Sequence, residues 1–251
     1  MIRSISTVYI LFFINYISFV AGDFPNNPKP CPYGDSECIK KVVNLFLDEK
    51  IGGYAPLNIP DLNPLKISEI AIKQPKENPV YIDLRFRNSR MHGFKGAKAT
   101  HVKGFGKDLE QTHEITISSK LMYLLSDYTI QGKVLVLPIS GTGRSNITMA
   151  NVKISLKLTG EPLVKNSETY MHVKKLKVGL DTTRVHFDFE NLYNGDKALG
   201  DTTNSFLNEN WKDIFGEVKN SILKAFTPVF KDVLNNVFEN LPYDKLFVEA
   251  S

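Results

Sequence analysis

Residues 206–241 read FLNENWKDIFGEVKNSILKAFTPVFKDVLNNVFENL, and their apolar side chains recur at spacings of three and four positions. This spacing is the period of an α-helix. A helix of 36 residues would extend about 54 Å at about 1.5 Å per residue. An apolar stripe of that length needs a groove to lie in, because it would otherwise be exposed to water. Pro228 lacks an amide hydrogen and therefore predicts a kink or a break within the helix.

Most of the chain upstream of this helix has the two-residue period of β-strands. In the clearest run, the apolar residues Val80, Ile82, Leu84 and Phe86 alternate with more polar residues. Further strands are expected at 108–118, 120–125, 131–139, 146–158, 170–180 and 183–189. Turns are expected at Asn88-Ser89, Gly104-Phe105-Gly106, Gly141-Thr142-Gly143, Gly160-Glu161-Pro162 and Asn194-Gly195-Asp196. Consecutive strands joined by short turns predict a long antiparallel sheet, and the longest strands predict that it is strongly curved.

A short amphipathic helix precedes the sheet. Asp35 or Ser36 can cap its start, and Gly52-Gly53 is expected to end it. Its apolar face consists of Ile39, Val42, Val43, Phe46 and Leu47. The sequence thus predicts an α+β fold in which a strongly curved antiparallel sheet wraps a long C-terminal helix, with a short N-terminal helix beside them. A wide sheet around one rod can leave an apolar space, and such spaces bind small hydrophobic molecules.

The N-terminus has the pattern of a secretory signal peptide. Arg3 is followed by an apolar core over residues 8–20 and by the small residues of Val20-Ala21-Gly22. The apolar core is about 13 residues long, whereas a membrane-spanning helix needs about 20. We therefore expect a signal peptide over 1–22 and a secreted, extracellular protein. Residues 23–251 are expected to form one domain, because β-rich units of this size are common.

The two cysteines fit this compartment. Cys31 and Cys38 have six residues between them and are expected to form a disulfide. A structural zinc site would need further thiols or suitably spaced histidines, so neither a metal nor a cofactor is expected. The sequon Asn146-Ile147-Thr148 predicts N-glycosylation at Asn146.

Charge and motifs argue against nucleic-acid binding and catalysis. The 31 basic and 27 acidic side chains are interspersed along the chain, whereas a nucleic-acid site needs clustered basic residues. His113-Glu114 lacks the second histidine of a zinc-protease motif, and Ser140 lacks the leading glycine of a nucleophile elbow. We therefore expect a protein that is not an enzyme.

Five segments resemble, in their order along the chain, the takeout/juvenile-hormone-binding-protein family of insects. They are CPYGDSEC (31–38), IPDLNPL (59–65), LPISGTG (137–143), FENLYNGDKALGDTTNSFLNENW (189–211) and LPYDKLF (241–247). The resemblance covers nearly the whole mature chain. It implies a TULIP-like super-roll and a secreted carrier that holds a lipophilic ligand in an internal tunnel. The hormone carriers of haemolymph have a second disulfide, which two cysteines cannot supply, so the resemblance is to the takeout-like branch.

Candidate ligand-binding residues are the apolar side chains that face inward from the helix and the strands. They are Phe86, Met91, Ile115, Tyr123, Leu137, Met149, Ile154, Tyr170, Val173, Phe187, Trp211, Phe215, Ile222, Phe226 and Phe230. The alternative for each is a place in a solid core. Their inward direction is assigned by parity, so a shift of one residue would exchange the two faces of a strand. Tyr123, Tyr128 and Tyr170 are candidates to offer a hydroxyl to the polar end of a ligand.

Two functions of different class follow. The first is a secreted carrier of a hydrophobic small molecule, such as a terpenoid, a fatty acid or a similar lipid. The alternative is binding to a membrane surface or to a protein partner through the amphipathic C-terminal helix. A basic helix face would favour the membrane, but lysines and acidic residues are mixed along this helix, which favours the carrier. A lipophilic ligand is the expected partner, without nucleic acid or stable membrane insertion; contact with a receptor or transient contact with a membrane stays open.

Overall fold

The structure is a computed structural model that describes Phe24 and residues 28–250, so the predicted signal peptide lies outside the described residues. The helices and strands follow one another as β1 (Cys31–Pro32), α1 (Ser36–Glu49), η1 (Ala55–Leu57), β2 (Leu65–Lys73), β3 (Val80–His92), β4 (Lys98–Lys103), β5 (His113–Val134), β6 (Leu137–Lys165), β7 (Glu168–Asp181), β8 (Arg184–Phe189), η2 (Tyr193–Gly195), α2 (Lys197–Glu209), α3 (Trp211–Phe238), α4 (Tyr243–Leu246) and β9 (Phe247–Val248). The predicted α+β fold is confirmed.

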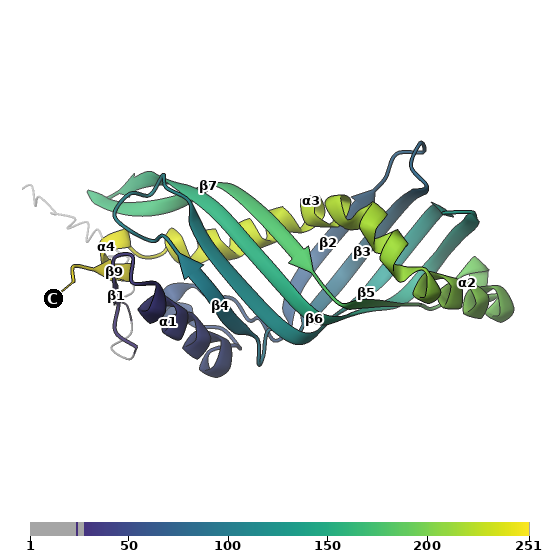
Figure 1. The fold of residues 1–251 in the computed structure, drawn as a ribbon, viewed down its shortest axis with the longest axis horizontal. Coiled ribbons are helices and arrows are strands. Elements are labelled where there is room, and N and C mark those ends of the chain that lie inside the picture. Colours follow the sequence, from purple (N-terminus) through teal and green to yellow (C-terminus); the bar gives the residue numbers. More distant parts are fainter. Residues whose placement is uncertain (1–23, 25–27, 251) are drawn as a thin grey trace, which may run out of the picture.

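Two very long strands organise the sheet. β5 has 22 residues and β6 has 29, and they pair with each other in antiparallel fashion along the length of the molecule (Figure 1). β4 pairs with the first part of β5 and β3 with the second part, while β8 pairs with the first part of β6 and β7 with the rest. The sheet is therefore two neighbouring half-sheets that share β5 and β6.

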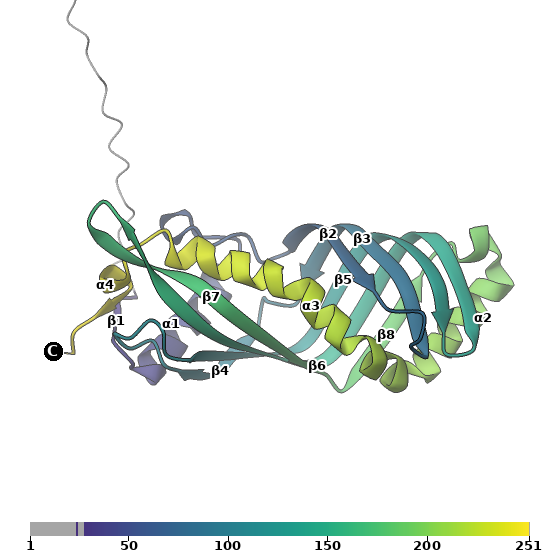
Figure 2. The same ribbon diagram turned by 90° about the horizontal axis from the view of Figure 1, so that it is seen from above.

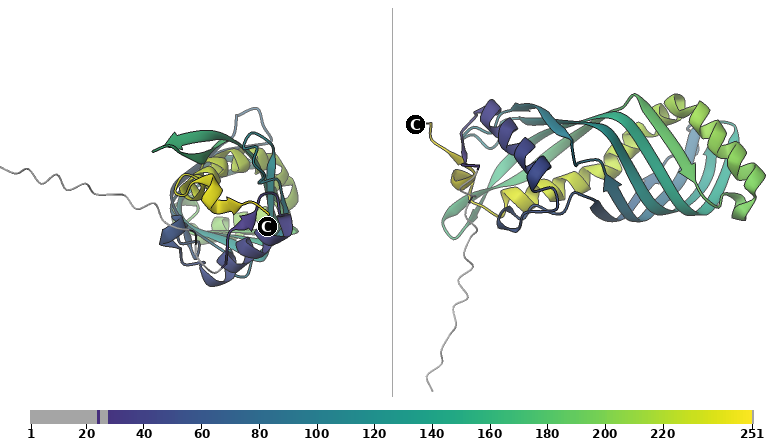
Figure 3. Two further views of the ribbon diagram at one scale, coloured as in Figure 1. Left: turned by 90° about the vertical axis from the view of Figure 1, so that its left-hand side faces the viewer. Right: turned by 90° about the horizontal axis from the view of Figure 1, so that it is seen from below.

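The helix α3 closes the open side of the curled sheet. It runs along the long axis of the molecule across the strands, as Figure 2 shows, and it contacts the edge strands β7 and β2 on its two sides. In the end-on view of Figure 3, the strands and α1 are arranged around the axis along which α3 runs. The predicted arrangement of a curved sheet around a long C-terminal helix is thus confirmed.

The break in the C-terminal helical region lies at Asn210, and the predicted break at Pro228 is wrong. Asn210 separates α2 from α3, and its side chain donates to the carbonyl oxygen of Phe206 at 2.9 Å. α3 continues through Pro228. Pro228 and Lys224, the residue whose carbonyl the proline leaves without a donor, are both exposed, so water can take the place of the missing bond.

Two predicted turns are wrong because their glycines serve close packing instead. Gly141-Thr142-Gly143 and Gly160-Glu161-Pro162 both lie within β6, and the hairpin turn falls at 135–136. A Cβ on Gly143 would lie 2.4 Å from the carbonyl oxygen of Glu190, and one on Gly141 would lie 3.0 Å from Leu192 Cα. The two glycines therefore let the segment after β8 cross β6 at close range.

Three further details of the sheet differ from the prediction, in which Asn88-Ser89 was a turn. Asn88-Ser89 is a bulge inside β3, where the register with β5 shifts between Arg87 and Arg90. The predicted strands 108–118, 120–125 and 131–139 divide differently, because β5 runs without interruption from His113 to Val134. Strand β4 was not predicted.

The N-terminal segment agrees with its prediction except that α1 ends before Gly52-Gly53, which were expected to end it. Asp35 caps α1 by accepting a hydrogen bond from the backbone N–H of Cys38 at 2.9 Å, and α1 ends at Glu49 with Lys50 as its C-cap. The predicted disulfide between Cys31 and Cys38 is confirmed, with an S–S distance of 2.00 Å. It joins β1 to the start of α1 at the end of the molecule where α4 and β9 lie (Figure 1).

Candidate functional site

Two apolar cavities lie between the sheet and α3. The first, cavity A, has a volume of about 120 Å³ and lies under β3, β5, β6, β8 and the first two thirds of α3. The second, cavity B, has a volume of about 250 Å³ and lies between α1, the start of β5 and the last third of α3. One buried water molecule needs roughly 10–15 Å³ of such space, so each cavity exceeds that size by about an order of magnitude.

Cavity A is lined by apolar side chains from every element around it. The alternation of β3 supplies Ile82, Leu84 and Phe86, which face inward at two-residue spacing, as the sequence predicts. The helix supplies Phe215, Ile222 and Phe226 among others at spacings that suit one helix face. Every described residue that lines this cavity has an apolar side chain.

Cavity B is built from less regular segments. The apolar face of α1 contributes Val42, Val43 and Phe46, and the disulfide contributes Cys31. Lys50 is the one charged side chain among the described residues that line this cavity. Its Nζ lies 5.8 Å from the centroid of the Tyr54 ring.

Ile154 and Phe230 line both cavities. Ile154 lies in β6 and Phe230 in α3, on opposite sides of the interior. We call this pair the neck. The two cavities therefore adjoin at the neck.

The structure brings ten of the fifteen candidate residues into these linings. Cavity A is lined by Phe86, Met91, Met149, Ile154, Phe187, Phe215, Ile222, Phe226 and Phe230. Ile115 lines cavity B. These placements describe the walls of the cavities, and whether each side chain contacts a ligand stays a prediction.

The other five candidates are absent from both linings. Tyr123 stacks on His92 with ring centroids 4.6 Å apart, and Leu137 lies half-buried at the start of β6. Tyr170 and Val173 are both buried, and Val173 belongs to the core cluster that also holds Leu246 of α4. Trp211 begins α3 under the guanidinium group of Arg184, which lies 5.7 Å from the ring centroid.

Two of the three tyrosine hydroxyls proposed as polar contacts have partners within the protein. The hydroxyl of Tyr128 donates to the backbone carbonyl of Glu190 at 2.7 Å, and burial raises the pKa of Tyr128 above its usual value. The hydroxyl of Tyr170 lies 3.4 Å from a carboxylate oxygen of Glu168. Sequence reasoning overlooked Lys50 instead, although its position two residues before Gly52-Gly53 and after an apolar helix face placed it at the end of α1.

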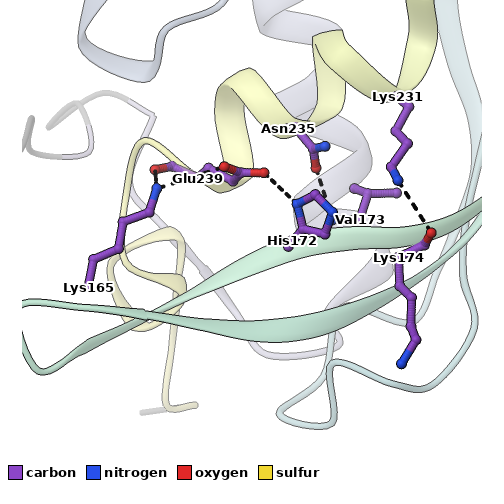
Figure 4. A network of polar contacts seen from close by, with 7 residues as sticks. All are labelled: Lys165, His172, Val173, Lys174, Lys231, Asn235 and Glu239. Carbon is purple, nitrogen blue, oxygen red and sulfur yellow. Dashed lines mark hydrogen bonds and ion pairs between the residues drawn. The ribbon is translucent and has the colours of Figure 1, made fainter. Parts of the chain in front are cut away.

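Polar contacts fasten α3 to the edge strand β7 beside cavity B (Figure 4). The side-chain oxygen of Asn235 accepts a hydrogen bond from the backbone N–H of Val173 at 2.9 Å. The carboxylate of Glu239 lies 2.6 Å from Nδ1 of His172, and the backbone carbonyl of Glu239 accepts from Lys165 at 3.1 Å. The contact with Asn235 occupies a backbone N–H of the edge strand β7 that would otherwise face water.

A second fastening holds α3 beside cavity A. Gln74, which follows β2 and is 8% exposed, donates from its side chain to the carbonyl oxygen of Glu217 at 2.7 Å and accepts from the hydroxyl of Ser221 at 3.2 Å. Lys219 pairs with Asp181 at the end of β7 at 3.0 Å. The helix is thus anchored by side chains at both ends of the apolar interior.

A buried histidine holds the wall of cavity B at Phe105. The backbone N–H of Phe105 donates to Nδ1 of His113 at 2.7 Å, so Nε2 carries the proton and donates to the carbonyl oxygen of Leu109 at 3.1 Å. Phe105 has φ of 59°, is 1% exposed and stacks on Phe238. Burial lowers the pKa of His113 below its usual value, which keeps the imidazole neutral and able to accept this bond.

Within the described residues, no group of three or more histidine, cysteine, aspartate or glutamate side chains is arranged to hold a metal ion. No helix in the same part of the chain is both long enough and apolar enough to cross a membrane.

A curled antiparallel half-barrel closed by a long helix, with apolar cavities between them, defines a class of protein with a hydrophobic interior site. The model of the family described as haemolymph juvenile hormone binding protein (JHBP) matches residues 8–248. The chain therefore belongs to this family, and the family predicted from the sequence is confirmed. The family is one of binding proteins by its description.

Relatives and a solved structure agree with this assignment. The circadian clock-controlled protein daywake of Drosophila melanogaster is 26% identical over 230 residues, which cover 89% of this chain and 88% of that protein. Daywake of Drosophila yakuba is 25% identical over the same shares of the two chains. The crystal structure of Takeout 1 from Epiphyas postvittana has a TM-score of 0.74 at 23% identity, and the match covers 87% of this chain and 99% of that chain.

Proposed function

We propose that this protein is a secreted carrier that binds a hydrophobic small molecule, such as a terpenoid, a fatty acid or a similar lipid, in an internal apolar tunnel. The observation that carries the proposal is the pair of cavities, which meet at Ile154 and Phe230 and have almost entirely apolar walls. Apolar cavities exclude water and accept apolar molecules. Burying about 400 Å² of apolar ligand surface contributes roughly 10 kcal/mol at ~25 cal/mol/Å² before the costs of association.

The position of α3 supports the carrier over the alternative of membrane or partner binding. Phe215, Ile222 and Phe226 point into cavity A, and Phe238 lines cavity B. The apolar face that would have to lie on a lipid surface is thus used inside the molecule. Flotation with liposomes tests the alternative: a carrier stays in the protein fraction, whereas a membrane-binding protein floats with the lipid.

The test of the carrier is the identification of a bound molecule. Protein purified from a eukaryotic host is measured by native mass spectrometry, and a second sample is extracted with organic solvent. The proposal expects a protein mass raised by a discrete lipophilic adduct that the extraction releases. An unmodified mass, together with failure of added fatty acids and terpenoids to bind, would contradict it.

Secretion and glycosylation belong to the same proposal. Asn146 lies in β6, where its neighbours Ile147 and Met149 line cavity A. Its amide oxygen accepts from the hydroxyl of Thr148 at 3.2 Å, and the side chain is partly exposed. Expression in insect cells should deliver the chain to the medium without residues 1–22. Enzymatic removal of N-glycans should then lower the mass of the secreted protein, but not that of an Asn146→Gln variant.

A further inference from the structure

One side chain distinguishes the walls of the two cavities. Lys50 is the C-cap residue of α1 and lines cavity B, whereas the described lining of cavity A has only apolar side chains. Its Nζ lies 5.8 Å from the centroid of the Tyr54 ring, and the Tyr54 ring in turn packs on Phe46 with ring centroids 5.7 Å apart. A lysine whose stem lies along an apolar wall holds its charge at the rim of that wall.

The surroundings of Lys50 favour a cation without neutralising it. The carbonyl end of α1 and the face of an aromatic ring both attract positive charge. The nearby carboxylate of Asp48 pairs with Lys98. Within the described part of the chain, no ion pair joins Lys50 to a carboxylate. Lys50 therefore offers ammonium hydrogens to an anion at the rim of cavity B.

We propose that cavity B receives the anionic head of a fatty-acid-like ligand, with Lys50 as the residue that binds its carboxylate. This inference rests on the proposed carrier function and names its ligand class. A carboxylic acid is ionised at neutral pH, and an ammonium–carboxylate contact is a charge-assisted hydrogen bond. The hydrocarbon tail then runs past Ile154 and Phe230 into cavity A. The reverse orientation would place the carboxylate among apolar side chains, where nothing compensates its loss of water.

The experiment compares hexadecanoic acid with its methyl ester, which has the same chain and no charge. Each compound displaces a fluorescent lipid from the wild type and from the variants Lys50→Met, Lys50→Arg and Lys41→Met. Methionine keeps the unbranched apolar stem of lysine, and Lys41 is an exposed lysine of the same helix. Circular dichroism of each variant establishes that α1 and the sheet are formed.

The wild type should bind the acid about tenfold more tightly than the ester, which corresponds to about 1.4 kcal/mol. Lys50→Met should remove this preference, because it should lower the affinity for the acid and leave the affinity for the ester unchanged. Lys50→Arg should keep the preference, and Lys41→Met should bind both compounds as the wild type does. Equal affinities of the wild type for acid and ester, or an equal loss of affinity for both in Lys50→Met, would overturn the head-group assignment. Neither result would contradict the carrier proposal. If the fluorescent lipid binds but neither compound displaces it, the fatty-acid assignment fails and the carrier stands. If neither the fluorescent lipid nor any added fatty acid or terpenoid binds, the carrier proposal fails and the assignment fails with it.

Discussion

Cavity A and cavity B are closed by the same sheet and the same helix, yet their walls differ in kind. Cavity A is walled mainly by strands in regular alternation, and its described lining is uniformly apolar. Cavity B is walled largely by α1 and connecting segments, which bring a lysine, a disulfide and a loop held by a buried histidine. Regular strands thus supply hydrophobic volume, and irregular segments supply the groups that can recognise the polar part of a ligand.

The uniform wall of cavity A should not tolerate a charge. Phe226 is 9% exposed and lines this cavity, so Phe226→Asp buries a carboxylate without a partner and should lower the free energy of unfolding by about 3–5 kcal/mol. Urea denaturation followed by circular dichroism measures the loss. Phe226→Leu is the matched control and should retain most of the stability. An aspartate variant as stable as the wild type would mean that this side chain does not face the cavity.

The wall of cavity B should respond to acid through His113. The folded protein holds this imidazole neutral with a lowered pKa, whereas the unfolded chain takes up a proton near its usual value of 6.5. Stability should therefore fall as the pH drops below about 6.5, and the loss should level off below the folded-state pKa. His113→Gln should lower stability at pH 7.5 by about 1–3 kcal/mol and flatten this dependence.

Urea midpoints between pH 7.5 and pH 5 measure the effect of His113. The control is His186→Gln, since His186 is exposed on β8 and its replacement should leave the pH dependence unchanged. If the stability of His113→Gln depends on pH as steeply as that of the wild type, the loss of stability at acid pH arises from other groups.

A larger side chain at the neck should weaken the binding of long ligands but not of short ones. Phe230→Trp adds volume where the cavities meet, so a ligand that spans both should be excluded. Affinity for hexadecanoic acid should fall about tenfold, while octanoic acid, which fits within one cavity, should bind as before. Calorimetric titration of both acids checks this, and an equal loss for both would indicate general damage to the interior.

The polar contacts between α3 and β7 beside cavity B should break more readily than the apolar packing beneath them. Asn235→Ala removes the acceptor for the backbone N–H of Val173 and should cost about 1 kcal/mol. Hydrogen exchange should become faster in β7 and the last turns of α3, but not around Gln74 beside cavity A. Asn236→Ala, at an exposed position of the same helix, is the control. Unchanged exchange at Val173 would show that this bond does not hold the edge strand.

The fold was predictable because the apolar residues follow the helical period and the strand period with few exceptions. The three- and four-residue spacing from Ile214 to Phe238 and the alternation of β3 identified the elements and their inward faces. Phe86, Phe215 and Phe226 follow from these periods alone, and all three line cavity A.

One parity does not hold along a whole strand where the backbone leaves regular geometry. Asn151 has φ of 48° in the middle of β6, and the inward positions change there from Ile147 and Met149 to Ile154. In β5 the inward positions change in the same region, from Ile115 to Met122, so Tyr123 lies outside the lining. No residue type in the sequence announces such a change, since asparagine merely tolerates positive φ better than most.

Tertiary packing accounts for the remaining errors. Gly141 and Gly143 read locally as a turn, but they are needed because Glu190 and Leu192 cross the strand there. Lys50 reads locally as the polar end of a helix, and its place at a cavity depends on α1 lying across cavity B from α3. Contacts between segments far apart in the chain leave no signature at either segment alone.

A crystal structure with 16-bromohexadecanoic acid would locate both ends of a bound ligand at once. We expect continuous ligand density past Ile154 and Phe230, a bromine anomalous peak within cavity A, and the carboxylate beside Lys50. Density confined to one cavity, ordered water in both, or bromine beside Lys50 would contradict a single tunnel that holds the tail in A and the head in B.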